Sequence, residues 1–235
     1  MNTPVILSEA KDHLATLDPL KMILRCAQDD RHSLDPPIPE GSSGPRKDNT
    51  TMARLHRDNA LLIVIDVQEK LTAVIHEQEQ LQRNIERLVR GCHILQVPAL
   101  LTEQYPKGLG PTTEQIKGAF DETYGTQAVQ KMCFSGYRCS EFVETIAPMN
   151  RKQVLVAGIE THVCVYQTVT DLLSAGYEVT VVADAVSSRT ARNREIALQR
   201  MAQEGAKWSS TEMALFELTV EAGSDEFKAI SKLVK

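Results

Sequence analysis

Apolar residues recur along the chain in two alternating patterns. Short continuous apolar runs are typical of strands buried on both faces of a sheet, and the clearest is ALLIVID at residues 60–66. The runs predict strands at 60–66, 98–102, 127–132, 152–159, 178–184 and 207–209. Each run is short, as expected for strands that cross a small sheet once.

Between the runs, apolar positions return at helical spacing. Leu81, Ile85, Leu88 and Leu95 belong to one such amphipathic helix. Further helices are predicted at 139–147, 161–175, 191–204, 211–220 and 225–234, and Gly176 stands where a helix-ending glycine belongs. Alternating strands and helices predict an α/β fold: three αβα layers around a mainly parallel, six-stranded, Rossmann-like sheet.

Residues 1–51 have a different composition from the rest. They hold six of the ten prolines, and LDPPIPEGSSGPRKDNTT at 34–51 is polar and turn-forming. Such a segment buries too little apolar surface to offset the entropy of ordering. We expect residues 1–51 to be a disordered extension, or the product of a mis-assigned start with Met52 as the true beginning, and residues 52–235 to form one compact domain.

Composition and charge narrow the function. The net charge is −5, so the basic surface that phosphate binding requires is missing and nucleic acid is not the expected partner. No apolar run approaches the ~20 residues that span a bilayer, so no membrane role is predicted. The five cysteines are odd in number and lack a CxxC pair, and no signal peptide precedes them. These features favour free thiols in the cytoplasm.

Polar residues follow the apolar runs where strands end: Asp66, Glu103, Lys131, Glu160 and Asp184. In an open parallel sheet, ligands bind beyond the carboxyl ends of the strands, near the switch in strand order. We therefore expect an acid, a base and a thiol to converge on one edge.

The thiol is Cys164, three residues into its predicted helix. We expect Thr161 to cap this helix, whose free N–H groups would favour thiolate and could hold the oxyanion of a tetrahedral intermediate. The alternative is a buried core cysteine, which is the commoner fate of a lone thiol.

Asp66 and Lys131 complete the candidate set. Asp66 could take the thiol proton and return it to a leaving amine, or it could only cap a helix or form a structural ion pair. Lys131 could pair with Asp66 and support the charged intermediate, or it could be a solvated lysine at a strand end.

Two other features have plainer interpretations. His162 lies two residues from Cys164, about 200° around a helix, so we expect it to pack or form an interface and not to assist the thiol. Ser187, Ser188 and Arg189 could contact substrate, but we expect them to cap the helix that begins near Ala191.

These residues, in this order, resemble the isochorismatase-like cysteine hydrolases. The motifs are LIVIDVQEKL around Asp66 and Gln68, VQKMCFSGY around Lys131, and GIETHVCVYQT around Cys164. The resemblance spans residues 61–233 and implies that fold, with Asp66, Lys131 and Cys164 as the catalytic triad. It also implies a cis peptide between Ile159 and Glu160, with the N–H groups of Glu160 and Cys164 as the oxyanion hole.

One branch is especially similar. LLTEQYPKGLGPT at 100–112, VVADAVSSR at 181–189 and the segment 197–218 are similar to isochorismatase-domain-containing proteins of animals and bacteria. That branch is of hydrolases with a poorly defined physiological substrate. Nicotinamidases of the superfamily carry a metal-binding Asp-x-His and a further histidine after the second strand, where this chain reads TEQYP at 102–106. The only Asp-x-His, at residues 30–32, lies in the N-terminal segment, so we expect no metal and no other cofactor.

The resulting hypothesis is a cysteine-dependent hydrolase of a small amide or related C–N substrate, acting through a thioester. The pocket residues are expected to be Gln68, Glu103, Gln104, Tyr105 and Phe134. The alternatives are vinyl-ether hydrolysis, as in true isochorismatases, and a catalytically idle binding protein of the same fold. We also expect a homo-oligomer, with the helix face at 163–172 as its interface.

Overall fold

The computed structural model describes residues 54–125 and 127–235, and the predictions for residues 1–51 lie outside them. The strands are β1 (Ala60–Ile65), β2 (Ala99–Gln104), β3 (Val129–Lys131), β4 (Gln153–Ile159), β5 (Glu178–Ser187) and β6 (Lys207–Ser209). They form one sheet in the order β3-β2-β1-β4-β5-β6, and every neighbouring pair is parallel. The predicted fold class is confirmed, with a sheet that is wholly parallel where we expected a mainly parallel one.

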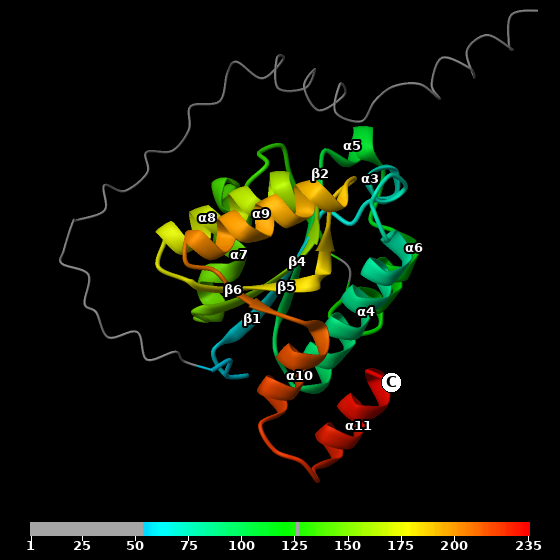
Figure 1. Cartoon of the computed structure of the whole chain (residues 1–235), viewed down its shortest axis with the longest axis vertical. Helices are drawn as coiled ribbons and strands as arrows, with labels where there is room; N and C mark the ends of the chain where they lie inside the picture. Colours follow the sequence, from blue (N-terminus) through cyan, green and yellow to red (C-terminus); the bar gives the residue numbers. More distant parts are fainter. Residues whose placement is uncertain (1–53, 126) are drawn as a thin grey trace, which may run out of the picture. The chain divides into compact units, whose positions relative to one another are not determined.

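Helices cover both faces of the sheet (Figure 1). One layer contains α4 (Gln78–Ile94), α6 (Glu114–Asp121), α10 (Thr211–Thr219) and α11 (Asp225–Leu233). The other contains α7 (Ser140–Ile146), α8 (Tyr166–Ser174) and α9 (Ala191–Gln203). Two single turns, α3 (Glu69–Thr72) and α5 (Pro106–Leu109), and the 3₁₀ turns η1 (Gly136–Arg138) and η2 (Ala147–Met149) complete the connections.

Most predicted elements are confirmed within one or two residues, and three helices were missed. Helix α6 presents Ile116, Ala119 and Phe120 to the interior, which is helical spacing in a segment of only eight residues. The single turns α3 and α5 are too short for periodicity to reveal.

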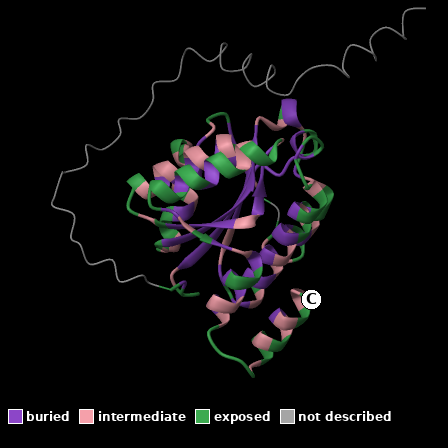
Figure 2. Ribbon diagram, in the orientation of Figure 1, coloured by how far each residue is buried: buried purple, intermediate pink, exposed green. Residues whose placement is uncertain are grey.

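Burial follows the layers. Every side chain of β1 and β4 is buried, whereas the helices are buried on their inner sides and exposed on their outer sides (Figure 2). Strand β1 pairs with β2 on one side and β4 on the other, so Ile65 lies between Thr102 and Gly158. Strand order reverses here, between β1 and β4, and this register brings the residues after all three strands to one edge.

Gly158 permits the close approach of β4 to β1. Its φ is +118°, and a Cβ at this position would lie 2.1 Å from the Ile65 carbonyl oxygen and 2.5 Å from the Ile65 nitrogen. Because both atoms belong to the central strand, neither can move aside without disturbing the sheet.

Gly158→Ala is therefore expected to lower the free energy of unfolding by about 3 kcal/mol, combining backbone strain with overpacking. Urea unfolding followed by circular dichroism measures the loss. The matched control is Gly205→Ala, which has a φ of +105° but nothing within 4 Å of its Cβ. It carries only the backbone term of about 1 kcal/mol. Equal losses in the two variants would contradict the role of the β1–β4 approach.

Candidate active site

The centre of the candidate site is a fully buried ion pair. Lys131 Nζ, at the end of β3, lies 2.7 Å from Asp66 Oδ2, just after β1, and both side chains are 0% exposed. Thr102 on β2 donates its hydroxyl hydrogen to Asp66 Oδ1 at 2.7 Å. Asp66 itself has a left-handed backbone with φ of 53°, which turns the chain sharply at the sheet edge. Residues on β2 and β3 thus hold the Asp66 carboxylate in place at the end of β1.

Lys131 donates to several acceptors within the protein. Besides Asp66, its ammonium lies within hydrogen-bond distance of Gln104 Oε1 at 2.8 Å, Phe134 O at 3.1 Å and Cys133 O at 3.3 Å. An ammonium carries three hydrogens, so these four acceptors use its donor capacity in full. Burial alone would lower the pKa of Lys131, but the neighbouring Asp66 carboxylate and Cys164 sulfur outweigh it and the pKa is raised. Lys131 therefore remains a fixed positive charge.

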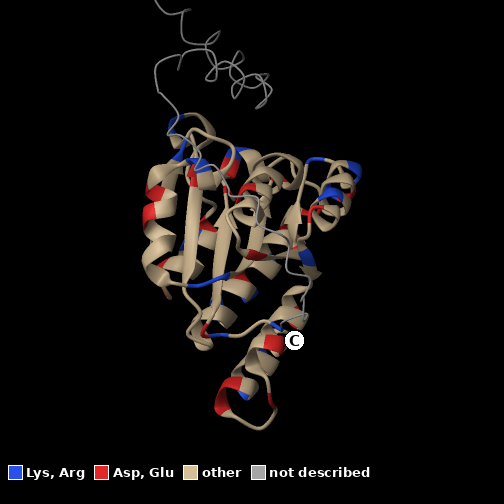
Figure 3. Ribbon diagram, turned by 90° about the vertical axis from the view of Figure 1, so that its left-hand side faces the viewer, with Lys and Arg blue, Asp and Glu red and all other residues tan. Residues whose placement is uncertain are grey.

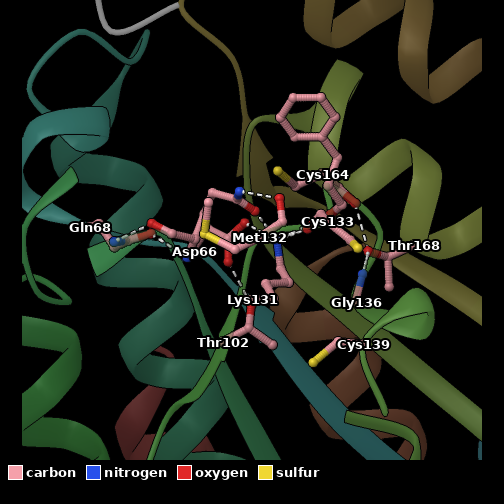
Figure 4. Close-up of polar contacts among 12 residues, drawn as sticks. Asp66, Gln68, Thr102, Lys131, Met132, Cys133, Gly136, Cys139, Cys164 and Thr168 are labelled. Carbon is pink, nitrogen blue, oxygen red and sulfur yellow. Dashed lines mark hydrogen bonds and ion pairs between the residues drawn. The ribbon is translucent and has the colours of Figure 1, made fainter. Parts of the chain in front are cut away.

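Cys164 completes the cluster from the opposite side, on the turn that follows β4 (Figure 4). Cys164 is 6% exposed, and its side chain is in contact with both the hydrophobic core and the ion pair. The Cys164 carbonyl accepts from Thr168 Oγ1 at 2.7 Å, and Thr168 Oγ1 accepts from the Gly136 N–H at 2.9 Å. Thr168 thereby joins the turn that carries Cys164 to the segment that surrounds Lys131.

The charge state of Cys164 differs from our expectation. Burial raises the pKa of this thiol, Asp66 and Glu160 raise it further, and only Lys131 lowers it. The prediction that the helix end favours thiolate is wrong, because loss of hydration outweighs the attraction of nearby positive charge. The resting group is a neutral thiol beside a carboxylate, so it would have to lose its proton as it attacks.

This pKa direction can be tested by alkylation. Because the pKa of Cys164 is raised, its reaction rate with iodoacetamide is expected to keep rising with pH above ~8.5, where a free cysteine levels off. Asp66→Asn removes a charge that raises this pKa and should shift the profile to lower pH. Peptide mass spectrometry resolves each cysteine, and the exposed Cys133 serves as the internal control. A Cys164 profile that levels off below that of Cys133 would contradict the burial argument.

The turn that carries Cys164 is not a regular α-helix. Residues Thr161–Val165 form a π-helical turn, η3, in which the Val165 N–H donates to the Glu160 carbonyl at 3.3 Å. The peptide between Ile159 and Glu160 is cis, as the resemblance implied. Glu160 and not Thr161 occupies the N-cap position, and the buried Thr161 hydroxyl has no hydrogen-bond partner among the described residues. The capping prediction is wrong, while the oxyanion role of the Glu160 and Cys164 amides stays a prediction.

Two predicted pocket residues, Gln68 and Gln104, form hydrogen bonds that hold neighbouring segments of the protein together. The Gln68 amide donates to the carbonyls of Gln104 and Gly110, at 3.0 and 2.7 Å, and accepts from the Gln104 N–H at 2.8 Å. Gln104 accepts from Lys131 and donates to the Met132 carbonyl at 2.7 Å. Both side chains lie beside the ion pair and are buried, so a direct substrate contact stays a prediction for each.

The other predicted pocket residues lie around the same edge. Glu103 Oε1 accepts from the Thr112 N–H and hydroxyl at 2.7 and 2.8 Å, which holds the segment after α5 in place. Tyr105 is half-buried, and its N–H donates to the Lys131 carbonyl at 3.0 Å. Phe134 is half-buried against the core cluster that includes Cys164. Their positions are compatible with a pocket wall.

Residues after β5 have a different role from the one expected. Thr190 caps α9 by accepting from the Asn193 N–H at 3.2 Å, so the capping role predicted for Ser187, Ser188 and Arg189 is wrong. Arg189 instead forms an ion pair with Glu160 at 2.6 Å. His162 is half-buried, and its Nδ1 lies 3.0 Å from Ser188 Oγ, consistent with the packing role predicted for it.

Asp184 does not join the site. Strand β5 continues to Ser187 after a register shift opposite Val156–Gly158, so Asp184 lies inside the strand. Its Oδ1 accepts from the Thr211 N–H and hydroxyl at 2.8 and 3.0 Å, at the start of α10. The prediction that Asp184 closes the strand is wrong because the irregularity extends the pairing by three residues.

The predicted interface segment has an inward and an outward side. Along residues 163–172, the apolar side chains of Val165, Val169 and Leu172 are fully buried in the core of a single chain. Val163, Tyr166 and Thr170 of the same segment are half-buried, so an interface on that side stays a prediction. Over residues 54–125 and 127–235, no group of three His, Cys, Asp or Glu side chains is placed to hold a metal ion. No helix within those ranges is long and apolar enough to cross a membrane.

Comparisons with known proteins place this geometry in context. A family model described as the isochorismatase domain matches residues 60–213. The secreted isochorismatase effector Isc1 of Phytophthora sojae is 41% identical over 186 residues, which cover 78% of this chain and 88% of that protein. Isochorismatase domain-containing protein 2 of Danio rerio is 38% identical, over 78% of this chain and 90% of the relative.

Solved structures agree. MAR1 ribonuclease from Caenorhabditis elegans superposes with a TM-score of 0.72 at 37% identity, covering 77% of this chain and 92% of that one. YcaC from Pseudomonas aeruginosa, solved with hexane-2,5-diol and covalent acrylamide, superposes with a TM-score of 0.71 at 25% identity, covering 78% and 92%. The six-stranded sheet and its helical layers are thus shared with known proteins.

Proposed function

The chain belongs to the isochorismatase family, and from that premise we propose that it hydrolyses a small amide or related C–N substrate with Cys164 as nucleophile. Relatives in this family support a hydrolase. The observation that carries the finer proposal is the buried Asp66–Lys131 pair against the buried Cys164 thiol. A charge pair withdrawn from water is costly, and its persistence beside a thiol favours a chemical role over a structural one.

The proposed reaction has two halves. In the first, Asp66 accepts the Cys164 proton while the sulfur attacks the substrate carbonyl carbon, and the N–H groups of Glu160 and Cys164 hold the oxyanion. The C–N bond then breaks, Asp66 gives the proton to the departing nitrogen, and an amine or ammonia leaves. A thioester on Cys164 remains.

In the second half, water attacks the thioester. Asp66 takes a proton from this water, the C–S bond breaks, and the proton returns to the sulfur as the carboxylic acid leaves. Lys131 donates to four protein acceptors and keeps its charge throughout, so it supports the anionic partners electrostatically and transfers no proton.

One solved relative supports the choice of small amides as test ligands. The structure of YcaC from P. aeruginosa contains covalent acrylamide, which is a small amide.

Covalent trapping tests the proposal. The enzyme is incubated with a panel of small primary amides and, separately, with p-nitrophenyl acetate, an activated acyl donor that a thiolate attacks. Peptide mass spectrometry is expected to find an acyl group on Cys164 and none on the half-buried Cys139. Turnover without any acyl group on Cys164, under conditions that slow the second half, would contradict the thioester.

The family also contains a competing reaction. Isochorismatase activity is cleavage of a vinyl ether, and it needs no thiol nucleophile, so activity that survives loss of Cys164 but not of Asp66 would point there. A catalytically idle binding protein would show neither acylation nor turnover. Self-association and a cytoplasmic location stay predictions. Light scattering tests self-association. The location needs its own test, because the P. sojae relative is described as secreted.

The C. elegans neighbour is described as a ribonuclease, which makes RNA a control substrate. Basic and acidic side chains are interspersed over the described residues (Figure 3), and the net charge of the chain is −5. Phosphate binding depends on concentrated positive charge, so the proposal favours a small uncharged amide over RNA.

A further inference from the structure

The segment at 187–190, which begins with the last residue of β5, is tied to the turn that carries Cys164 by side chains that the proposed reaction does not use. Arg189 donates to Glu160 three times: Nη2 to Oε1 at 2.6 Å, Nε to Oε2 at 3.1 Å and its backbone N to Oε2 at 3.1 Å. This is a bidentate, charge-assisted pair with an added backbone bond, the geometry that restricts orientation most strongly.

The same segment is held on both sides. Ser188 contacts His162 of the π-helical turn, with Oγ 3.0 Å from Nδ1. On the other side, the Ser187 hydroxyl donates to the His76 carbonyl at 2.8 Å, and the His76 N–H donates to the Ser188 carbonyl at 3.0 Å. Residues that follow β1, β4 and β5 are therefore joined through three consecutive positions.

Glu160 is an unusual residue for such a restraint. Its carboxylate is 6% exposed, whereas the Arg189 side chain is 28% exposed. Burial would raise the pKa of Glu160, but the Arg189 bonds outweigh it and the pKa is lowered, so the carboxylate is ionised at neutral pH. The amide of the same residue is one of the two predicted oxyanion donors. Fixing the side chain therefore also restricts rotation of that N–H.

We propose that Arg189 is a positioning residue that, through the Glu160 carboxylate, holds the Glu160 N–H in the direction of the developing oxyanion. The inference rests on the proposed cysteine mechanism. The alternative is that Arg189 binds an anionic group of the substrate. A positioning residue affects the rate constant of the reaction step, whereas a binding residue affects the affinity for substrate.

The experiment compares two reactions of the same thiol. Acylation by p-nitrophenyl acetate passes through an oxyanion, whereas alkylation by iodoacetamide displaces iodide at a saturated carbon and forms none. The variants are Arg189→Gln, Arg189→Lys and Glu160→Gln, with Arg192→Gln as the matched control, because the Arg192–Glu195 pair lies on the exposed side of α9. Thermal unfolding checks that each variant is folded.

Arg189→Gln and Glu160→Gln are each expected to lower the acylation rate constant about 10–100-fold, since a small displacement of one oxyanion donor has effects of this size. Alkylation of Cys164 should stay within about threefold of wild type in the Arg189 variants because no oxyanion forms. In Glu160→Gln it should not fall, because loss of the Glu160 charge lowers the pKa of the thiol. Arg189→Lys keeps the charge without the fork and should fall between wild type and Arg189→Gln. The two Gln changes combined should be no worse than either alone, because they break one interaction.

Four results would overturn the inference. Equal losses in acylation and alkylation would mean that Arg189 only stabilises the turn, and a raised KM with unchanged kcat would mean that it binds substrate. Wild-type acylation in folded Arg189→Gln or Arg189→Lys would remove the positioning role while leaving the proposed function intact. Wild-type enzyme that is alkylated but never acylated at Cys164 would remove the proposed function as well.

Discussion

Replacing Cys164 with alanine is expected to lower kcat/KM for amide hydrolysis at least about 10⁴-fold, the size of effect seen when a covalent nucleophile is removed. The residual rate would be what the oxyanion donors and substrate binding supply without a thioester. The Cys164 side chain is small and the remaining cavity slight, so the free energy of unfolding should change by about 1 kcal/mol or less. Ammonia release measures the first quantity and urea unfolding the second.

Two comparison variants sharpen this result. Cys139→Ala changes a half-buried thiol outside the ion-pair cluster and should keep full activity. Cys164→Ser keeps a hydroxyl in the same place but should remain nearly inactive, because a hydroxyl is a much weaker nucleophile than a thiol at neutral pH. Full turnover by Cys164→Ala on a substrate of the wild-type enzyme would refute the mechanism.

Breaking the Asp66–Lys131 pair from either side is expected to cost about 3–5 kcal/mol of unfolding free energy, because the remaining charge would be buried without its partner. Asp66→Asn and Lys131→Met are the single variants. The double variant removes both charges and should recover most of the lost stability, yet remain inactive. Wild type, the two single variants and the double variant would thus show that the pair affects stability and activity in different ways.

The exposed pair of Lys117 and Asp121 on α6, 3.1 Å apart, provides the control cycle. Its coupling should be about 0.3–0.5 kcal/mol, the usual value for a solvated pair one turn apart. Urea unfolding of the seven proteins, with wild type shared by the two cycles, measures both couplings. Additive losses at Asp66 and Lys131 would mean that the two side chains do not act as a unit, and recovery of activity in the double variant would show that the pair is only structural.

The features that could be predicted from sequence are those that depend on local pattern. Strand β1 is a continuous apolar run because helices cover it on both faces, and the acid that follows it had to lie at the carboxyl edge. The same reasoning placed Lys131 and Cys164 beside Asp66, and the structure brings all three together. Helix α6 was within reach of this approach, since Ile116 and Phe120 lie one turn apart.

The features that were missed depend on distant parts of the chain. The sequence predicts that the fifth strand ends at Asp184. In the structure β5 continues beyond it because of its irregular pairing with β4 around Gly158, which no local pattern in β5 reveals. The thiol pKa was expected to fall, since sequence reveals a turn but not the side chains that exclude water from it. The Glu160–Arg189 pair joins residues 29 positions apart, and nothing local at either position indicates the other.

The way in which Lys131 is held affects how this site can change. Two of its acceptors are the main-chain carbonyls of Cys133 and Phe134, so those positions serve the lysine whatever side chains they bear. The Cys133 side chain itself is exposed. Substitutions at positions 133 and 134 can therefore reshape the neighbourhood of the thiol while the ammonium keeps its contacts. We therefore expect changes at these two positions to alter substrate range with little effect on the contacts of Lys131, which makes them the natural starting points for directed evolution.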